Sequence, residues 1–166
     1  MKQAIVVFLK KNKIIELIRK KDVPQYHKYR PHITLVYPFE INNQKLLAKH
    51  IKDSVKNIKP FTLVMKGLKK SAKDHYLYLL VKSGKKEIMR LYKHLNSGIL
   101  KGFENKEMPA YIPHLTIGKF EKKKELDETI KNLKKKNIMH KEKIKSVQLM
   151  MLNKDNSLRK VKQFRL

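Results

Sequence analysis

The sequence contains no cysteine. This absence excludes a disulfide framework, a thiolate metal site and a cysteine nucleophile, and it favours a reducing, cytoplasmic compartment. Long hydrophobic runs are missing as well. The apolar run Ile5 to Leu9 is followed by Lys10 and Lys11, so its charge order is the reverse of that in a signal peptide, and it is too short to span a bilayer. We interpret it as a β-strand and expect no association with a membrane.

Acidic residues are few, since 14 Asp and Glu stand against 41 Lys and Arg, and the formal net charge is +27 with a pI near 10.2. A basic surface attracts polyanions such as nucleic acids. Almost all of the excess is lysine, accompanied by abundant Ile and Asn, which codon bias in an AT-rich genome also produces. The lysines therefore indicate either a dedicated polyanion surface or compositional drift, and charge alone identifies no substrate.

Hydrophobic periodicity divides the chain into alternating strands and helices. Strand patterns cover residues 3–9, 61–68, 75–81, 144–152 and 157–164, and helical spacing covers residues 12–20, 43–57, 85–95 and 122–135. Two polar segments, 22–30 and 102–112, each with a proline, lead into further strands at 31–36 and 113–118. We expect residues 1–166 to form a single α+β domain with two lobes of similar plan, two mainly antiparallel sheets facing a central cleft and helices packed outside.

A tetrapeptide of the form Pro-His-aliphatic-Thr occurs twice, as Pro31-His32-Ile33-Thr34 and Pro113-His114-Leu115-Thr116. A chain with seven histidines and four threonines should contain well under one His-x-Thr pair by chance. The flanking residues also match, because aliphatic residues alternate with polar ones in both copies. The repetition predicts two equivalent strands that contribute to one site.

Strand geometry places the His and Thr of each copy on the same face and the aliphatic residues on the other. If the strands meet across a cleft, His32, Thr34, His114 and Thr116 surround one position. Histidine can act as general base or general acid near neutral pH, and threonine hydroxyls can donate to phosphate oxygens. The four residues thus form a candidate catalytic site for a phosphodiester.

Other residues near the motifs are open to two interpretations. Arg30 shares the parity of His32 and is a candidate phosphate contact, although Pro31 disturbs the geometry. The cleft face would extend to Val36 and Gly118, where glycine allows either close approach of a substrate or a β-bulge. Tyr76 and Tyr78 share a face and could stack on a base, but we expect them to pack in the core.

The remaining histidines include His50, His75, His94 and His140, and none shows metal-ligand spacing to another histidine or a carboxylate. We assign no metal ligand to any of them. No cofactor is expected either.

The residues His32-Ile33-Thr34-Leu35 and His114-Leu115-Thr116-Ile117 resemble the double motif of the two-histidine (2H) phosphoesterase superfamily, which includes 2'-5' RNA ligase-like proteins and RNA 2',3'-cyclic phosphodiesterases. The resemblance covers essentially the whole chain. It implies a bilobal fold with internal pseudo-symmetry, metal-independent catalysis and an active site made of the two His-x-Thr pairs.

The resemblance further implies hydrolysis of 2',3'-cyclic phosphates at the ends of RNA or nucleotides, with His114 activating water, His32 protonating the leaving oxygen, and 2'-5' ligation as the reverse reaction. The expected partner is an RNA end or a small nucleotide, and the expected state is a monomer. Two alternatives stay open: a phosphodiesterase for another small nucleotide, and a non-catalytic module that binds RNA or nucleotide phosphate.

Overall fold

The computed structural model describes residues 1–24, 26–71, 74–103 and 110–166. The expected turn residues 72–73 and Pro109 of the expected second loop lie outside these ranges. The elements are, in chain order, β1 (Lys2–Phe8), α1 (Lys13–Asp22), β2 (His32–Glu40), α2 (Gln44–Val55), β3 (Phe61–Lys70), β4 (Tyr76–Ser83), α3 (Lys85–Leu95), the 3-10 helix η1 (Gly98–Leu100), β5 (His114–Lys119), α4 (Lys123–Lys135), β6 (Met139–Ile144), β7 (Ser146–Leu152) and β8 (Leu158–Arg165).

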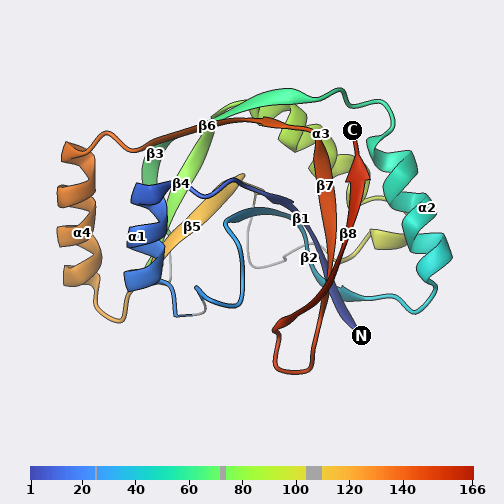
Figure 1. Cartoon of the computed structure of the whole chain (residues 1–166), viewed down its shortest axis with the longest axis horizontal. Coiled ribbons are helices and arrows are strands. Elements are labelled where there is room, and N and C mark those ends of the chain that lie inside the picture. Colours follow the sequence, from blue (N-terminus) through green and yellow to red (C-terminus); the bar gives the residue numbers. More distant parts are fainter. Residues whose placement is uncertain (25, 72–73, 104–109) are drawn as a thin grey trace.

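The strands form two antiparallel sheets of four strands, with helices outside them (Figure 1). The first sheet has the order β2-β1-β7-β8 and the second the order β5-β4-β3-β6. The expected α+β fold with two antiparallel sheets is confirmed. The sheets are not built from consecutive halves of the chain, because the chain crosses from β6 of the second sheet into β7 of the first at Lys145.

The two motif strands, β2 and β5, occupy equivalent positions at the edges of their sheets and contact each other. Each follows a strand–helix connection, β1–α1 in one case and β4–α3 in the other. The helices are exchanged between the sheets, since α1 packs against β5 and α3 packs against β2. This exchange holds the motif edges of the two sheets together.

Local sequence explains where α1 and α2 begin. The Asn12 side chain accepts hydrogen bonds from the backbone N–H of Ile14 and Ile15, and the Asn43 side chain accepts one from Leu46 at 3.0 Å. These bonds satisfy N–H groups that have no partner inside a helix. The expected starts of the first two helices are therefore within one residue of the observed ones.

Strand β6 was not expected, because its sequence carries His140 and Glu142 where apolar residues would mark a buried face. The strand does alternate, with His140 and Ile144 buried. The His140 Nε2 atom lies 3.0 Å from a Glu142 carboxylate oxygen, and the same carboxylate accepts from the backbone N–H of Lys10. Because the two polar side chains satisfy each other, they can lie on the buried face of a strand.

A single hydrophobic cluster runs through both sheets and their helices. It includes the four aliphatic residues that alternate with the motif His and Thr residues, namely Ile33, Leu35, Leu115 and Ile117, each at most 3% exposed. Burial of these side chains turns the opposite face of β2 and β5 away from the core. That face is available for a site between the sheets.

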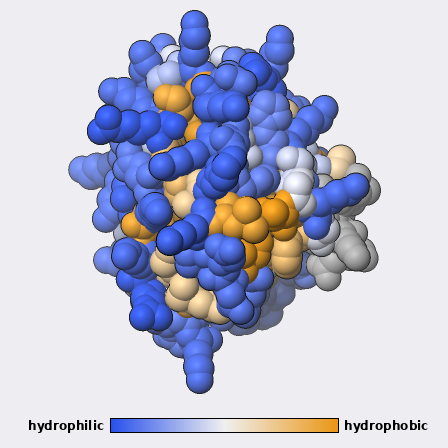
Figure 2. All heavy atoms as spheres, turned by 90° about the vertical axis from the view of Figure 1, so that its right-hand side faces the viewer, coloured by the Kyte–Doolittle hydropathy of each residue, from blue (hydrophilic) through white to orange (hydrophobic). Residues whose placement is uncertain are grey.

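The face of the molecule on the side of α2 is largely hydrophilic and carries a smaller apolar patch (Figure 2). Lysines lie on outer elements of both sheets. Lys45, Lys49, Lys52 and Lys162 line a groove beside α2 and β8, and Lys123, Lys124 and Lys131 lie with Asp127 and Glu128 along α4. Within the described residues, no helix has the length and apolar character needed to cross a membrane.

Candidate active site

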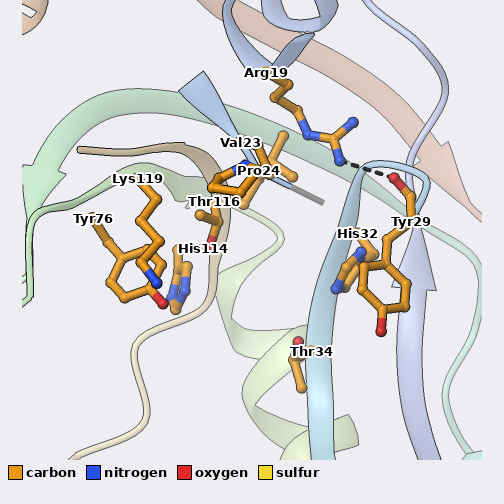
Figure 3. Close-up of a pocket in the computed structure, with 11 residues that line it drawn as sticks. Arg19, Val23, Pro24, Tyr29, His32, Thr34, Tyr76, His114, Thr116 and Lys119 are labelled. Atoms are coloured by element: carbon orange, nitrogen blue, oxygen red, sulfur yellow. Dashed lines mark hydrogen bonds between the residues drawn. The ribbon is translucent and has the colours of Figure 1, made fainter. Parts of the chain in front are cut away.

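A cavity of about 280 Å³ lies between the two motif strands. All four motif side chains line it, those of β2 on one side and those of β5 on the other (Figure 3). The other lining residues come from α1, the segment that follows it, β4 and the end of β5. The complete lining is Arg19, Val23, Pro24, Tyr29, His32, Thr34, Tyr76, His114, Leu115, Thr116 and Lys119.

The two imidazoles are held by identical local hydrogen bonds. His32 Nδ1 lies 2.7 Å from the Arg30 carbonyl oxygen, and His114 Nδ1 lies 2.7 Å from the Ile112 carbonyl oxygen. A carbonyl oxygen can only accept, so each Nδ1 must carry the proton that it donates. In a neutral ring the lone pair is therefore on Nε2. Both histidines consequently use Nε2 for any proton exchange in the cavity.

Burial favours the neutral form of both rings. It lowers the pKa of His32 below the ordinary value of 6.5, and the charges of Arg19 and His114 lower this pKa further, while the bond to the Arg30 carbonyl opposes the shift. Burial is also the main cause that lowers the pKa of His114, and Lys69 adds to it. The cavity thus disfavours two positive imidazoles at once, which suits a pair that works with one proton between them.

Both motif strands carry a β-bulge directly after the threonine. Thr34 pairs with Val6 but Val36 pairs with Ile5, so Leu35 is an extra residue in β2. Thr116 pairs with Tyr78 but Gly118 pairs with Leu77, so Ile117 is the extra residue in β5. A bulge shifts the side-chain parity by one position. It is a second repeated feature of the two motif strands.

The bulges correct the expectation that the cleft face continues to Val36 and Gly118. Val36 is fully buried in the core, and Gly118 is buried under the Phe120 ring. A Cβ atom at position 118 would lie 2.6 Å from Phe120 Cε2. Of the two interpretations for Gly118, the bulge is confirmed, and the close neighbour is a side chain of the protein. Because of the shifted parity, Lys119 joins His114 and Thr116 on the cavity face.

The repeat extends further upstream than the sequence analysis recognised, because a tyrosine precedes each His by three residues: Tyr29 and Tyr111. The Tyr29 hydroxyl donates to the Asn156 carbonyl in the β7–β8 turn, whereas the Tyr111 hydroxyl donates to the Thr34 carbonyl at 2.7 Å. The segment that leads into the second motif is thus bonded to the strand of the first motif. Alignment of the two windows from the tyrosine onward would have revealed both residues.

A buried asparagine supports the bulge in β2. Asn96, which follows α3, donates from Nδ2 to the Leu35 carbonyl at 2.9 Å and to the Tyr92 carbonyl at 2.8 Å, and it is 6% exposed. Leu35 is the extra residue of the bulge, so its carbonyl needs a partner other than the regular ladder. Two consecutive carbonyls of β2, those of Thr34 and Leu35, are therefore bonded by Tyr111 and Asn96, which fixes the backbone directly after the Thr34 side chain.

Arg19, which the sequence analysis did not consider, is the arginine that lines the cavity. It is 3% exposed and donates to a Glu16 carboxylate oxygen at 2.7 Å and to the Tyr29 carbonyl at 3.0 Å (Figure 3). Arg30, the expected phosphate contact, does not line the cavity, and its guanidinium lies 4.9 Å from the centre of the Phe8 ring. The signal for Arg19 in the sequence is a lone arginine among the lysines of α1.

Tyr76 and Tyr78 are not core residues, which corrects the expectation that they pack inside. Both are half-buried on the cavity face of β4, and Tyr76 lines the cavity. Their rings stack at 6.2 Å, and the Tyr78 ring lies 3.9 Å from the His114 imidazole. Burial, with the neighbouring Tyr37, Tyr76 and Asp74, raises the pKa of Tyr78 to about 12, so its hydroxyl stays protonated at neutral pH.

The lining residues define what the cavity can do. Two imidazoles offer exchangeable protons, two threonines offer hydroxyl donors, Arg19 and Lys119 add positive charge, and no carboxylate is among the described residues that line it. This combination favours an anionic ligand and proton transfer to and from it. Among the described residues, no group of three or more His, Asp or Glu side chains is placed to hold a metal ion.

Comparison with known proteins gives a consistent match along most of the chain. The family described as the 2'-5' RNA ligase superfamily matches residues 8–156. A protein of Bacillus licheniformis, classed as a phosphoesterase by inference, is 29% identical over 154 residues, which cover 90% of this chain and 89% of that protein.

Solved structures show the same fold at low sequence identity. The structure of TT0787 from Thermus thermophilus aligns with a TM-score of 0.63 and 14% identity, covering 100% of this chain and 98% of that one. The structure of LigT from E. coli in complex with 3'-AMP aligns with a TM-score of 0.57 and 11% identity, covering 99% and 94%. The two cavity histidines can therefore be interpreted within a known fold.

Proposed function

The chain belongs to the 2'-5' RNA ligase superfamily, a family with phosphoesterase relatives, and from this premise we propose that it hydrolyses 2',3'-cyclic phosphates at the end of an RNA strand or on a nucleotide. The proposed catalytic residues are His32, Thr34, His114 and Thr116. The observation that carries the proposal is the matched state of the two imidazoles, since each donates its Nδ1 proton to a carbonyl two residues upstream and keeps Nε2 for the cavity.

The reaction needs one proton removed and one delivered. His114 Nε2 takes a proton from water as the water oxygen attacks phosphorus. The bond from phosphorus to the ribose 2' or 3' oxygen breaks, and His32 Nε2–H gives its proton to the departing oxygen. The products are a phosphate monoester and a free hydroxyl. Each general acid or base contributes about 10²- to 10⁴-fold to the rate.

The threonines and the positive lining stabilise the phosphate. Thr34 and Thr116 both line the cavity, one beside each histidine, where their hydroxyls can donate to the non-bridging oxygens. Charge on these oxygens grows in the transition state, so donors fixed in advance lower the barrier. The repeated bulges and the bond from Tyr111 to the Thr34 carbonyl keep the threonines in place.

The size of the cavity favours one nucleotide as the unit that is bound. Its volume of about 280 Å³ is just below the range of ligand pockets, which run from about 300 to 1,000 Å³. One nucleoside with its cyclic phosphate is a ligand of this class, either free or as the last unit of a strand. The complex of LigT with 3'-AMP supports a mononucleotide unit for this fold.

A direct assay tests the proposal. Purified protein would be incubated in EDTA with a nucleoside 2',3'-cyclic phosphate and with a short RNA that ends in a cyclic phosphate. We expect turnover that is lost in His32→Gln and in His114→Gln and retained in His27→Gln, because His27 is exposed and outside the cavity lining. The position of the phosphate in the product identifies the leaving oxygen.

Two outcomes would contradict this function. A wild-type protein that turns over neither substrate, but binds RNA as tightly as both histidine variants, would be a binding module. Turnover that survives in either histidine variant at the wild-type rate would remove that histidine from the mechanism. Ligation is tested in the same assay by adding an excess of RNA with a free 5' hydroxyl and measuring joined 2'-5' product.

A further inference from the structure

One end of the cavity combines an aromatic ring with a cation that forms no ion pair among the described residues. Tyr76 of β4 and Lys119 of β5 are directly opposite each other in the antiparallel ladder, and both line the cavity. The Lys119 ammonium lies 5.4 Å from the centre of the Tyr76 ring (Figure 3). Residues opposite each other on one sheet face are close enough to act on one ligand.

The charge of Lys119 is free to act on a ligand. No carboxylate in the described part of the chain pairs with it, although five side-chain or terminal cations elsewhere, those of Met1, Arg19, Lys28, Lys49 and Lys70, do have one. Lys119 is exposed at the rim, so its ammonium can leave the ring and contact a ligand.

The distance along β5 separates this place from the reacting phosphate. Lys119 is five residues after His114, but Ile117 is an extra residue in the bulge, so the two lie four ladder positions apart, about 13 Å along the strand at roughly 3.3 Å per residue. The cavity, of which the ring and the cation line one end, has a volume of about one nucleotide. Because Lys119 is exposed, this end opens to the surface, and a ligand longer than one nucleotide can pass the ring and the cation where it leaves the cavity.

We propose that Tyr76 and Lys119 form a subsite for the penultimate nucleotide of an RNA strand, with its base against the Tyr76 ring and its connecting phosphate at Lys119. This proposal rests on the proposed function and names its substrate as an RNA end. An aromatic ring accepts any base, because every base has a π-face, and the lysine contacts only the backbone. The subsite therefore selects strand length and not base sequence.

The test compares two substrates that differ only in length: a nucleoside 2',3'-cyclic phosphate and the dinucleotide that ends in the same cyclic phosphate. We expect kcat/KM of the wild type to be about tenfold higher for the dinucleotide, since stacking of one base contributes about 5- to 150-fold. This ratio should fall toward one in Tyr76→Leu and in Lys119→Gln. Tyr76→Phe keeps the ring and should keep the ratio.

A third substrate separates the base from the phosphate. In a dinucleotide whose penultimate unit lacks its base, Lys119→Gln should still lower kcat/KM, while Tyr76→Leu should cause no loss relative to wild type. Lys119→Gln should also weaken the salt dependence of kcat/KM for the dinucleotide. Lys162→Gln removes the same charge from β8 outside the cavity and should leave the length preference unchanged.

The outcomes distinguish this proposal from the proposed function. Equal kcat/KM for the two substrate lengths in the wild type overturns the subsite while hydrolysis stands. An equal fold loss on both lengths in Lys119→Gln places that lysine at the reacting nucleotide and also overturns it. If the protein turns over neither substrate, the proposed function fails, and the subsite is judged from the Kd values of mono- and dinucleotides with a 3' phosphate. Equal Kd values overturn it.

Discussion

The hydrogen bond from the Tyr111 hydroxyl to the Thr34 carbonyl offers a direct test of how the two motifs are joined. Tyr111→Phe removes the hydroxyl and keeps the ring, which stacks on Tyr92 with centroids 3.8 Å apart and planes 4° apart. The bond length of 2.7 Å is in the favourable range for a hydroxyl donor. The substitution therefore changes one bond and little else.

The expected cost follows from the environment of that bond. A typical hydrogen bond contributes about 0.5–1.5 kcal/mol net, and a buried group left without a partner costs about 1–3 kcal/mol. Tyr111 packs against the core, and burial raises the pKa of its hydroxyl well above 10. We expect the free energy of unfolding to fall by about 1–3 kcal/mol, which for a domain of this size lowers Tm by roughly 2–4 °C per kcal/mol.

Urea denaturation measures this change, and Tyr29→Phe is the matched control. Tyr29 has the same place in the repeat, but its hydroxyl donates to Asn156 in the β7–β8 turn. The control should cost less, because that turn is largely exposed and water can replace the lost partner. Equal losses in the two variants would refute the reasoning. So would a loss for Tyr111→Phe that differs between pH 6 and pH 9, because the hydroxyl stays protonated across that range.

Four further predictions concern the cavity and its support. Because burial lowers the pKa of both cavity histidines, the proposed mechanism, which uses one as acid and one as base, should give a bell-shaped pH profile of kcat/KM with its maximum below pH 6.5. An optimum above pH 7 would contradict this. Because the pKa of each ring is lower in the folded state, the unfolded chain binds more protons, and the free energy of unfolding should fall as pH drops from about 6.5 through the lowered pKa values. The fall should be smaller in a variant with both histidines replaced by glutamine, and urea midpoints at several pH values measure the difference. Arg19→Gln leaves the Glu16 carboxylate, whose side chain is 13% exposed, without its partner and should cost about 1–3 kcal/mol in urea denaturation, with recovery in the double variant with Glu16→Gln. The same substitution should raise the pKa of His32 in NMR titration. Gly118→Ala places a Cβ atom 2.6 Å from the Phe120 ring and should lower the free energy of unfolding by about 1–3 kcal/mol. In a Phe120→Leu background the same substitution should cost less, and an equal loss in thermal melts of both backgrounds would argue against the clash.

Several parts of the site were predictable because they depend on local geometry alone. In a strand, side chains alternate between faces, so the spacing of His32 and Thr34 placed them together away from Ile33 and Leu35. The same held in the second copy. Their repetition indicated that two strands share one site. The missed tyrosines, Tyr29 and Tyr111, also belonged to the repeat and could have been found by extending it upstream.

Other features were not predicted from the sequence, because they depend on contacts between distant residues. The sequence of β6 is too polar to indicate a strand, and only the packed structure shows that His140 and Glu142 pair with each other on its buried face. Arg19 differs from the surrounding lysines in residue type, but its burial could not be predicted, because that burial depends on the packing of α1 against β5 of the other sheet. The burial of a charged residue is decided by its partners, which the local pattern does not reveal.

The sequence by itself determined the two His-x-Thr strands, the helix starts and the α+β class, because hydrophobic period and capping residues act over a few positions. Only the tertiary structure decided which residues besides the motifs reach the cavity. Parity counted along β5 would place Lys119 on the face opposite His114, and the bulge at Ile117 brings both to the same face. A bulge exists only in relation to a paired strand. The composition of this cavity therefore depends on strand register between segments far apart in the chain.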